Sequence, residues 1–131
     1  AVRAMRRRGT GEQLAVKTLR TTVHVNGTGN LVGANLKALR NEVRSLCAAQ
    51  GHPGVLRLRA VYESPVALHV VTELCAGGDL LRLLLPLRPG GLGEGSAAAV
   101  GWHVLGALAH LHAAPQLLAH RDVKLENVAL A

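Results

Sequence analysis

The chain has 131 residues, a hydrophobic content of 49% and a formal net charge of +7. This length corresponds to one domain, and the apolar content is sufficient for a packed core. The basic charge does not indicate a nucleic-acid partner, because Arg6, Arg7 and Arg8 precede a glycine turn where solvated charge is ordinary, and no aromatic residue interleaves with them.

Two strands are predicted at the start of the chain, over residues 1–6 and 13–20, joined by the Gly9-Thr10-Gly11 turn. The second strand contains Leu14-Ala15-Val16-Lys17, whose alternation places one basic side chain on a strand. A lysine held in this way can reach phosphate oxygens as a point charge. It also needs an acidic partner that keeps it oriented.

A polar, glycine-rich insertion is expected over residues 21–33, before a helix that carries Glu42. Apolar residues at positions 36, 39, 43 and 46 follow helical spacing and indicate this helix. Gly51-His52-Pro53-Gly54 ends it, because glycine and proline disfavour continuation. Glu42 is the acidic partner expected for Lys17, although the long interval between the two residues leaves this ion pair open.

Two further strands are expected, over residues 55–61 and 67–73, followed by a Gly77-Gly78 turn. A short helix is predicted from Asp79 to Leu85, and the Asp79 carboxylate at its start is able to bond a sugar hydroxyl. The proline- and glycine-rich residues 86–95 are expected to form a loop, whose function is left unassigned.

A long helix is expected next, with Ser96 as its N-cap, because apolar residues at positions 100, 104, 108 and 111 recur at helical spacing. Residues 96–119 contain no Asp, Glu, Lys or Arg and are long enough to span a bilayer. No membrane partner is expected, because the segment also contains polar and helix-breaking residues: His103, His110, His112, Pro115 and Gln116.

The two cysteines, Cys47 and Cys75, form no C-x-x-C pair, and no secretory leader is visible. These features indicate a reduced, intracellular protein, and the cytoplasm is the expected location. The seven histidines show no ligand spacing typical of zinc, so no structural zinc is expected.

The most informative segment is His120-Arg121-Asp122-Val123-Lys124-Leu125-Glu126-Asn127. It places a carboxylate, an ammonium and a carboxamide at the offsets suited to orienting a hydroxyl against a nucleotide γ-phosphate while the amide holds Mg²⁺. With Lys17, Glu42 and the strand-and-glycine segment 68–80 preceding it in this order, the chain resembles a eukaryotic protein kinase domain of the Ser/Thr type.

The resemblance implies an α+β, protein-kinase-like fold with two lobes, in truncated form. Residues 1–74 would be the small lobe, residues 75–79 the hinge, and residues 80–131 the start of the large lobe. It also implies that the long helix from Ser96 is the central helix of the large lobe, packed on several sides.

The resemblance further implies ATP and Mg²⁺ as cofactors. Asp122 would orient the substrate hydroxyl as the catalytic base, Lys124 would neutralise charge on the γ-phosphate, and Asn127 would bind Mg²⁺ through its oxygen. Lys17, paired with Glu42, would bind the α- and β-phosphates. The other contacts implied are Val2 and Ala15 above the adenine and Ala129 below it, Thr72 at the inner end of the hinge, the Glu73 carbonyl and the Cys75 amide at the adenine edge, and Asp79 at the ribose. Glu126 would offer either its backbone carbonyl to the ribose or its side chain to a basic residue of the substrate.

The implied activity is transfer of the γ-phosphate of ATP to a Ser or Thr hydroxyl of a protein substrate. The alternative is a non-catalytic, kinase-like binding or scaffold module, because the sequence contains neither the G-x-G-x-x-G loop nor the Asp-Phe-Gly segment. For the same reason these 131 residues alone are expected to be an incomplete and inactive part of the enzyme. The substrate, the regulator and the oligomeric state are left open.

Overall fold

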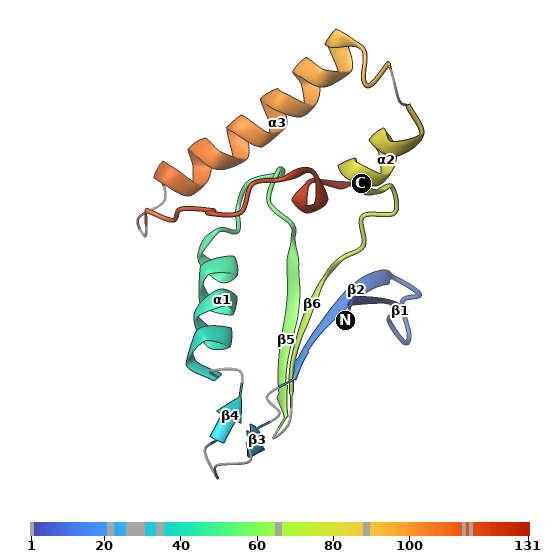
Figure 1. The fold of residues 1–131 in the computed structure, drawn as a ribbon. Coiled ribbons are helices and arrows are strands. Elements are labelled where there is room, and N and C mark those ends of the chain that lie inside the picture. The colour runs from blue at the N-terminus through green and yellow to red at the C-terminus, as the bar shows by residue number, and fades with distance from the viewer. Residues whose placement is uncertain are drawn as a thin grey trace. The chain divides into compact units, whose positions relative to one another are not determined.

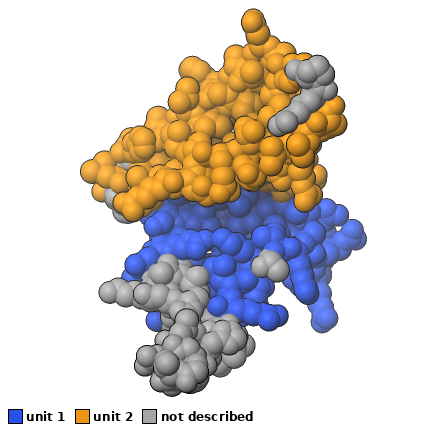
Figure 2. Space-filling model, viewed as in Figure 1, with its two compact units in different colours: residues 1–50, 56–74 blue, residues 51–55, 75–131 orange. Residues whose placement is uncertain are grey.

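A computed structural model of the chain describes residues 2–20, 23–25, 31–33, 36–64, 67–87, 90–113, 115 and 117–131. These residues divide into two compact units, which are coloured separately in Figure 2: residues 1–50 with 56–74, and residues 51–55 with 75–131. The first unit contains an antiparallel sheet with a helix, and the second is mainly helical. The expected α+β class is therefore confirmed.

The first unit contains a four-stranded antiparallel sheet in the order β1-β2-β6-β5 (Figure 1). Its strands are β1 (Val2–Arg6), β2 (Gln13–Arg20), β5 (Leu58–Ser64) and β6 (Ala67–Glu73). The β1–β2 hairpin and β6 have the predicted positions. Gly9 and Gly11, at φ values of 88° and 73°, occupy a left-handed region that favours glycine, which explains why the chain reverses there.

The core of the first unit follows the central strand β6. Leu68, Val70 and Val71 are buried there, and Leu14 is buried on the neighbouring strand β2. A strand that pairs on both edges and is buried on both faces needs a nearly continuous apolar run, which is what residues 67–73 provide.

The helix predicted around Glu42 is α1 (Leu36–Ala48). The predicted insertion before it contains two short paired strands that the sequence did not indicate, β3 (Val23–Val25) and β4 (Leu31–Gly33). Antiparallel pairing provides hydrogen-bond partners for backbone N–H and C=O groups that would otherwise bind water. The other residues of the insertion lie outside those that the structure describes.

The start predicted for the strand over residues 55–61 is wrong by three residues, because β5 begins at Leu58. Residues before it form a turn in which the Val55 N–H donates to the His52 carbonyl at 3.0 Å. The Gln50 carboxamide accepts from the Leu58 N–H at 2.9 Å, and β5 then pairs with β6 as far as Ser64. Pairing with a distant strand, rather than local sequence, therefore sets these bounds.

The second unit contains the elements β7 (Gly78–Asp79), α2 (Leu80–Leu84), α3 (Glu94–Ala113) and β8 (Ala129–Leu130), with 3-10 turns at Leu85–Leu87 and Leu125–Asn127. Helix α2 confirms the short helix that was predicted. The turn at residues 51–55 also belongs to this unit, since the His52 ring stacks on His110 of α3 with ring centroids 5.3 Å apart.

Helix α3 begins at Glu94, so the prediction of Ser96 as its N-cap is wrong. The Ala97 N–H donates to the Gly93 carbonyl at 3.0 Å, which makes Gly93 the residue before the first helical turn. The Glu94 carboxylate in that turn is favourable, because the helix N-terminus carries partial positive charge. The predicted loop over residues 86–95 therefore ends at Gly93, because Glu94 is already helical.

The predicted apolar positions of α3 lie on its less exposed side, where Leu111 is buried. Trp102 and Leu105 are 78% and 65% exposed, so among the described residues α3 is not packed on several sides as expected. Within the described part of the chain, no helix combines the length and apolar character that crossing a bilayer requires.

Candidate functional site

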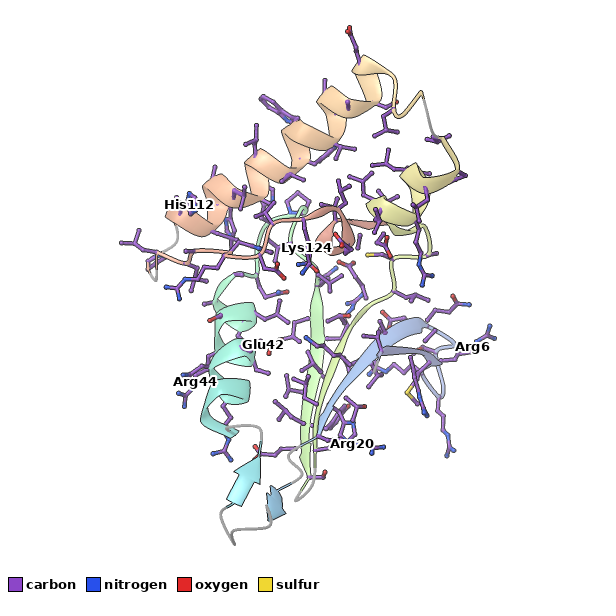
Figure 3. The ribbon with its side chains drawn as sticks, viewed as in Figure 1. Arg6, Arg20, Glu42, Arg44, His112 and Lys124 are labelled. Carbon is purple, nitrogen blue, oxygen red and sulfur yellow. The ribbon has the colours of Figure 1, made fainter. Side chains whose placement is uncertain are left out.

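In the first unit, the ammonium of Lys17 on β2 lies 2.8 Å from the Glu42 carboxylate on α1. The expected ion pair is thus present, across 25 residues of sequence. A second ion pair joins the same helix to the sheet, from Arg40 to Glu63 on β5 at 2.6 Å. Figure 3 shows Glu42 on the side of α1 that faces the sheet, with Arg44 pointing away from it.

Strand register places four sequence-predicted residues on one face of this sheet. Val2 is the cross-strand partner of Lys17, and Ala15 is the partner of Thr72. Since cross-strand partners point to the same side and alternate residues share a face, all four lie on the Lys17 face. The face therefore presents one ammonium beside small and apolar side chains, while the nucleotide contacts expected of these residues stay predictions.

Thr72 is buried, with 7% of its surface exposed, and its hydroxyl donates to the Glu73 carbonyl at 3.1 Å. The Glu73 carboxylate accepts from the Arg57 N–H at 2.7 Å, while the Glu73 N–H donates to the Arg57 carbonyl at 3.0 Å. Glu73 therefore fixes the end of β6 against the start of β5. This structural role of its side chain was not predicted from sequence.

In the second unit, the structure brings together Asp79 and Ala129, which are cross-strand partners in the β7–β8 pair. The Asp79 carboxylate accepts from the Arg82 N–H at 2.9 Å and so caps α2. Capping satisfies a helix N–H that would otherwise have no partner within the helix. The second carboxylate oxygen of Asp79 lies 3.5 Å from the Arg82 guanidinium, so both oxygens contact Arg82, which the sequence reasoning missed.

Cys75 and Gly77 lie just before this strand pair. The Cys75 carbonyl accepts from the Gly78 N–H at 3.3 Å, and the Gly77 N–H donates to the Leu130 carbonyl at 2.9 Å. A β-carbon on Gly77 would lie 2.8 Å from the Leu130 β-carbon, closer than such atoms approach in proteins. Glycine is therefore required at this position, and the Gly-Gly pair was the signal for it.

The segment around Asp122 forms a compact cluster of polar groups. One Asp122 carboxylate oxygen lies 2.8 Å from the Lys124 ammonium and accepts from the Asn127 amide at 2.9 Å. The same amide nitrogen donates to the Asp122 carbonyl at 2.8 Å. The Asp122 N–H donates to His120 Nδ1 at 3.3 Å, so each end of the segment holds Asp122 in place.

These contacts shift the titration of both charged groups. The hydrogen bond from Lys124, followed by that from Asn127, lowers the pKa of the Asp122 carboxyl from its ordinary value. The hydrogen bond to Asp122 in turn raises the pKa of Lys124. The segment therefore presents an ionised carboxylate, able to accept a hydrogen bond from a hydroxyl, beside an ammonium whose charged form the carboxylate stabilises.

Asn127 directs its amide nitrogen to Asp122, and its amide oxygen has no hydrogen-bond partner among the described residues. An amide oxygen is a suitable ligand for Mg²⁺, which binds few protein oxygens and completes its shell with water and phosphate. The donor set therefore fits a magnesium ion through this single atom. Within the described chain, no group of three or more His, Cys, Asp or Glu side chains is placed to hold a metal.

The backbone of Arg121 has a φ of 63°, which is uncommon for a residue other than glycine. The strained residue directly precedes Asp122, and strain of this kind occurs where surrounding contacts determine the conformation. No feature of the sequence indicated it. Glu126 lies in the 3-10 turn that follows, with its side chain exposed.

A sequence profile of the protein kinase domain matches residues 1–131. The chain belongs to the protein kinase family. The expected resemblance is therefore confirmed over the whole of the sequence. Its relatives include a probable myosin light chain kinase of Dictyostelium discoideum, which is 32% identical over 130 residues and is matched over 99% of this chain and 37% of its own length.

Two plant kinases are similar to a comparable extent. CBL-interacting protein kinase 4 of Oryza sativa subsp. japonica is 38% identical over 120 residues, covering 92% of this chain and 25% of the relative. Calcium-dependent protein kinase 2 of Arabidopsis thaliana is 31% identical over 120 residues, covering 92% of this chain and 17% of the relative. The chain thus spans well under half the length of the relatives that it matches.

Proposed function

We propose that the protein carrying this chain is an ATP- and Mg²⁺-dependent serine/threonine protein kinase. The observation that carries the proposal is the cluster of Asp122, Lys124 and Asn127, with contacts of 2.8–2.9 Å, in a chain of the protein kinase family. In such enzymes catalysis depends mainly on positioning and on electrostatic stabilisation, so few protein groups are needed.

The reaction joins the substrate hydroxyl oxygen to the γ-phosphorus of ATP and breaks the bond to ADP. Asp122 orients the hydroxyl and accepts its proton, for which an exposed carboxylate held on one side by Asn127 is well suited. Lys124 stabilises negative charge on the transferred phosphoryl group. Bound Mg²⁺, held by the Asn127 oxygen, would neutralise phosphate charge.

Lys17 binds the α- and β-phosphates in this proposal, and Glu42 keeps its ammonium directed along the sheet face. The remaining nucleotide contacts follow the family pattern: Val2, Ala15 and Ala129 at the adenine faces, Thr72, Glu73 and Cys75 along its edge, and Asp79 with Glu126 at the ribose. The Asp79–Ala129 strand pairing supports the assignment of these two residues to the same ligand. Residues 1–74, 75–79 and 80–131 are assigned in the same way to the small lobe, the hinge and the start of the large lobe.

A protein Ser or Thr hydroxyl is the proposed acceptor, and an intracellular, cytoplasmic location is proposed with it. Support for the acceptor comes from relatives named as myosin light chain, calcium-dependent and CBL-interacting protein kinases. Lys124 in the loop is also the residue typical of Ser/Thr rather than tyrosine transfer in the family that the sequence resembles.

The test uses the natural full-length protein, radiolabelled ATP and a mixture of peptides with Ser, Thr or Tyr as the acceptor. Wild type should label Ser and Thr peptides, and Asp122→Asn should lower the rate by about a hundredfold or more. Glu94→Gln, an equal loss of carboxylate charge at the start of α3, is the control and should retain the rate. ATP binding with no transfer by wild type would instead support a non-catalytic module.

A further inference from the structure

The sheet of the first unit has a second face, which we call the outer face, opposite to Lys17. Register places Met5, Leu14, Val16 and Val71 on it, because Met5 partners Leu14 and Val16 partners Val71. Both ion pairs from α1 reach Lys17 and Glu63, whose side chains point to the other side. Among the described residues of this unit, α1 is the only helix, so no helix covers the outer face.

The outer face contains a hollow of about 500 Å³ lined by side chains of all four strands. Its apolar lining includes Leu14 and Val71, which are 9% and 7% exposed, together with Val16. Met5 and Tyr62 line it as well and are 56% and 63% exposed. The hollow therefore has a buried apolar floor and exposed apolar walls, an arrangement that leaves large side chains in contact with water.

Three arginines have their side chains on the outer face: Arg7 and Arg59 line the hollow, and register places Arg3 beside it as the cross-strand partner of Val16. One carboxylate lies among them, because Glu12 contacts Arg59 at 2.9 Å and Arg7 at 3.7 Å. Three positive charges are thus matched by a single negative charge. The Glu12 contacts also show that arginines from the β1–β2 turn and from β5 converge on one carboxylate, which an arginine binds through its planar fork.

We infer that the outer face docks an acidic, amphipathic segment of a partner protein. The apolar side chains of that segment fill the hollow above Leu14 and Val71, and its carboxylates pair with Arg3, Arg7 and Arg59. An apolar centre with a charged, arginine-rich rim is the composition of a protein interface. This inference concerns a surface away from Lys17 and does not depend on phosphate transfer.

The chemistry of the hollow favours a protein over other partners. A small ligand is normally enclosed over most of its surface, whereas Met5 and Tyr62 leave this hollow open to solvent. Single-stranded nucleic acid would need aromatic side chains for stacking, and apart from Tyr62 and the His69 ring the lining is aliphatic or arginine. A helical segment that carries carboxylates beside an apolar face complements both the arginine charges and the apolar floor of the hollow.

The test uses the full-length protein and two fluorescein-labelled helical peptides with leucine at i, i+3, i+4 and i+7. One peptide carries glutamate at its flanking positions, and the matched peptide carries lysine there. Fluorescence anisotropy should show binding of the glutamate peptide, weakened by salt, and binding of the lysine peptide that is at least about tenfold weaker. Equal affinity of the two peptides would overturn the inference.

Two variants locate the binding on the outer face. Arg3→Glu should weaken binding of the glutamate peptide by about fivefold or more, whereas Arg44→Glu on α1 makes the same charge change elsewhere and should leave it unchanged (Figure 3 labels Arg44). Met5→Asp should weaken binding to a similar extent. The Arg3 and Met5 side chains are exposed, so neither change should unfold the protein, and an unchanged thermal midpoint verifies that each variant is folded.

Unchanged affinity in both Arg3→Glu and Met5→Asp would exclude the outer face. Phosphatidylserine vesicles and duplex DNA are measured in parallel. If the protein binds the vesicles or the DNA more tightly than the peptide, and Arg3→Glu abolishes that binding, the arginines bind phosphate instead and the inference is overturned.

Discussion

The Lys17 ammonium and the Glu42 carboxylate lie 2.8 Å apart, on a strand and on a helix that are separated in sequence by the β3–β4 pair. Their side chains are 48% and 55% exposed. An ion pair that is so accessible to water contributes little to stability, about 1 kcal/mol or less. The contact is therefore better explained by the orientation that it gives Lys17.

Glu42→Gln is expected to separate stability from activity. The free energy of unfolding should fall by about 1 kcal/mol or less, because the pair is exposed. The KM for ATP should rise or kcat should fall, since Lys17 loses the group that directs it. Urea unfolding and steady-state kinetics on the full-length protein measure the two effects. Arg40→Gln, which breaks the neighbouring ion pair with Glu63, is the control and should change stability without the same kinetic effect.

Lys124→Met is expected to raise the pKa of Asp122. Lys124 is the largest cause of the lowered pKa, so its removal returns the carboxyl toward the ordinary value, while Asn127 preserves part of the shift. NMR titration of the Asp122 carboxyl carbon in wild type and variant gives the comparison. Lys124→Arg keeps a positive donor and should leave the pKa low. A pKa that does not move in Lys124→Met would show that this ion pair does not form in solution.

The contacts between Asp122, Lys124 and Asn127 also determine how the contributions of Asp122 and Lys124 to stability change with pH. Because the Asp122 pKa is lowered on folding, its contribution to stability is present above the ordinary carboxyl pKa and is lost as pH falls through the lowered value. Because the Lys124 pKa is raised, its contribution is present below the ordinary ammonium pKa and is lost as pH rises through the raised value. Activity that depends on ionised Asp122 should therefore persist into mildly acidic solution.

Asp79→Ala is expected to destabilise the second unit by about 1 kcal/mol, because α2 loses its N-cap. Asp79→Ser retains a capping oxygen and should restore most of that loss. If Asp79 also binds ribose, both variants should raise the KM for ATP, since neither keeps a carboxylate. Thermal unfolding and ATP kinetics of the two variants separate the roles, and normal KM values in both would leave Asp79 with the capping role alone.

Gly77→Ala is expected to destabilise the fold by about 1–3 kcal/mol, because the added β-carbon would overlap Leu130 at 2.8 Å and force the strand pair apart. Gly101→Ala is the matched control within α3, where nothing lies within 4 Å of the added carbon. Alanine there should stabilise the helix by up to about 1 kcal/mol. Chemical unfolding of both variants tests the contrast, and a neutral Gly77→Ala would contradict the close approach to Leu130.

Much of the fold could be predicted where periodicity and turn residues agree, as in the β1–β2 hairpin, β6, α1 and α2. The predictions failed at the starts of β5 and α3. Strand β5 starts where Gln50 and β6 supply hydrogen bonds, and α3 starts one turn earlier than the serine cap suggested. Both bounds depend on backbone partners that the local residue pattern does not reveal.

The sequence by itself determined the family and the candidate groups, because Lys17, Glu42, Asp122 and Asn127 occur in a fixed order with suitable chemistry. The tertiary structure alone decided that Lys17 meets Glu42, that Asp79 adjoins Ala129, and that Gly77 touches Leu130. These contacts join residues that are 25 or more positions apart. Local propensities carry no information about such distances, since strand pairing and helix docking arise only when the whole unit is packed.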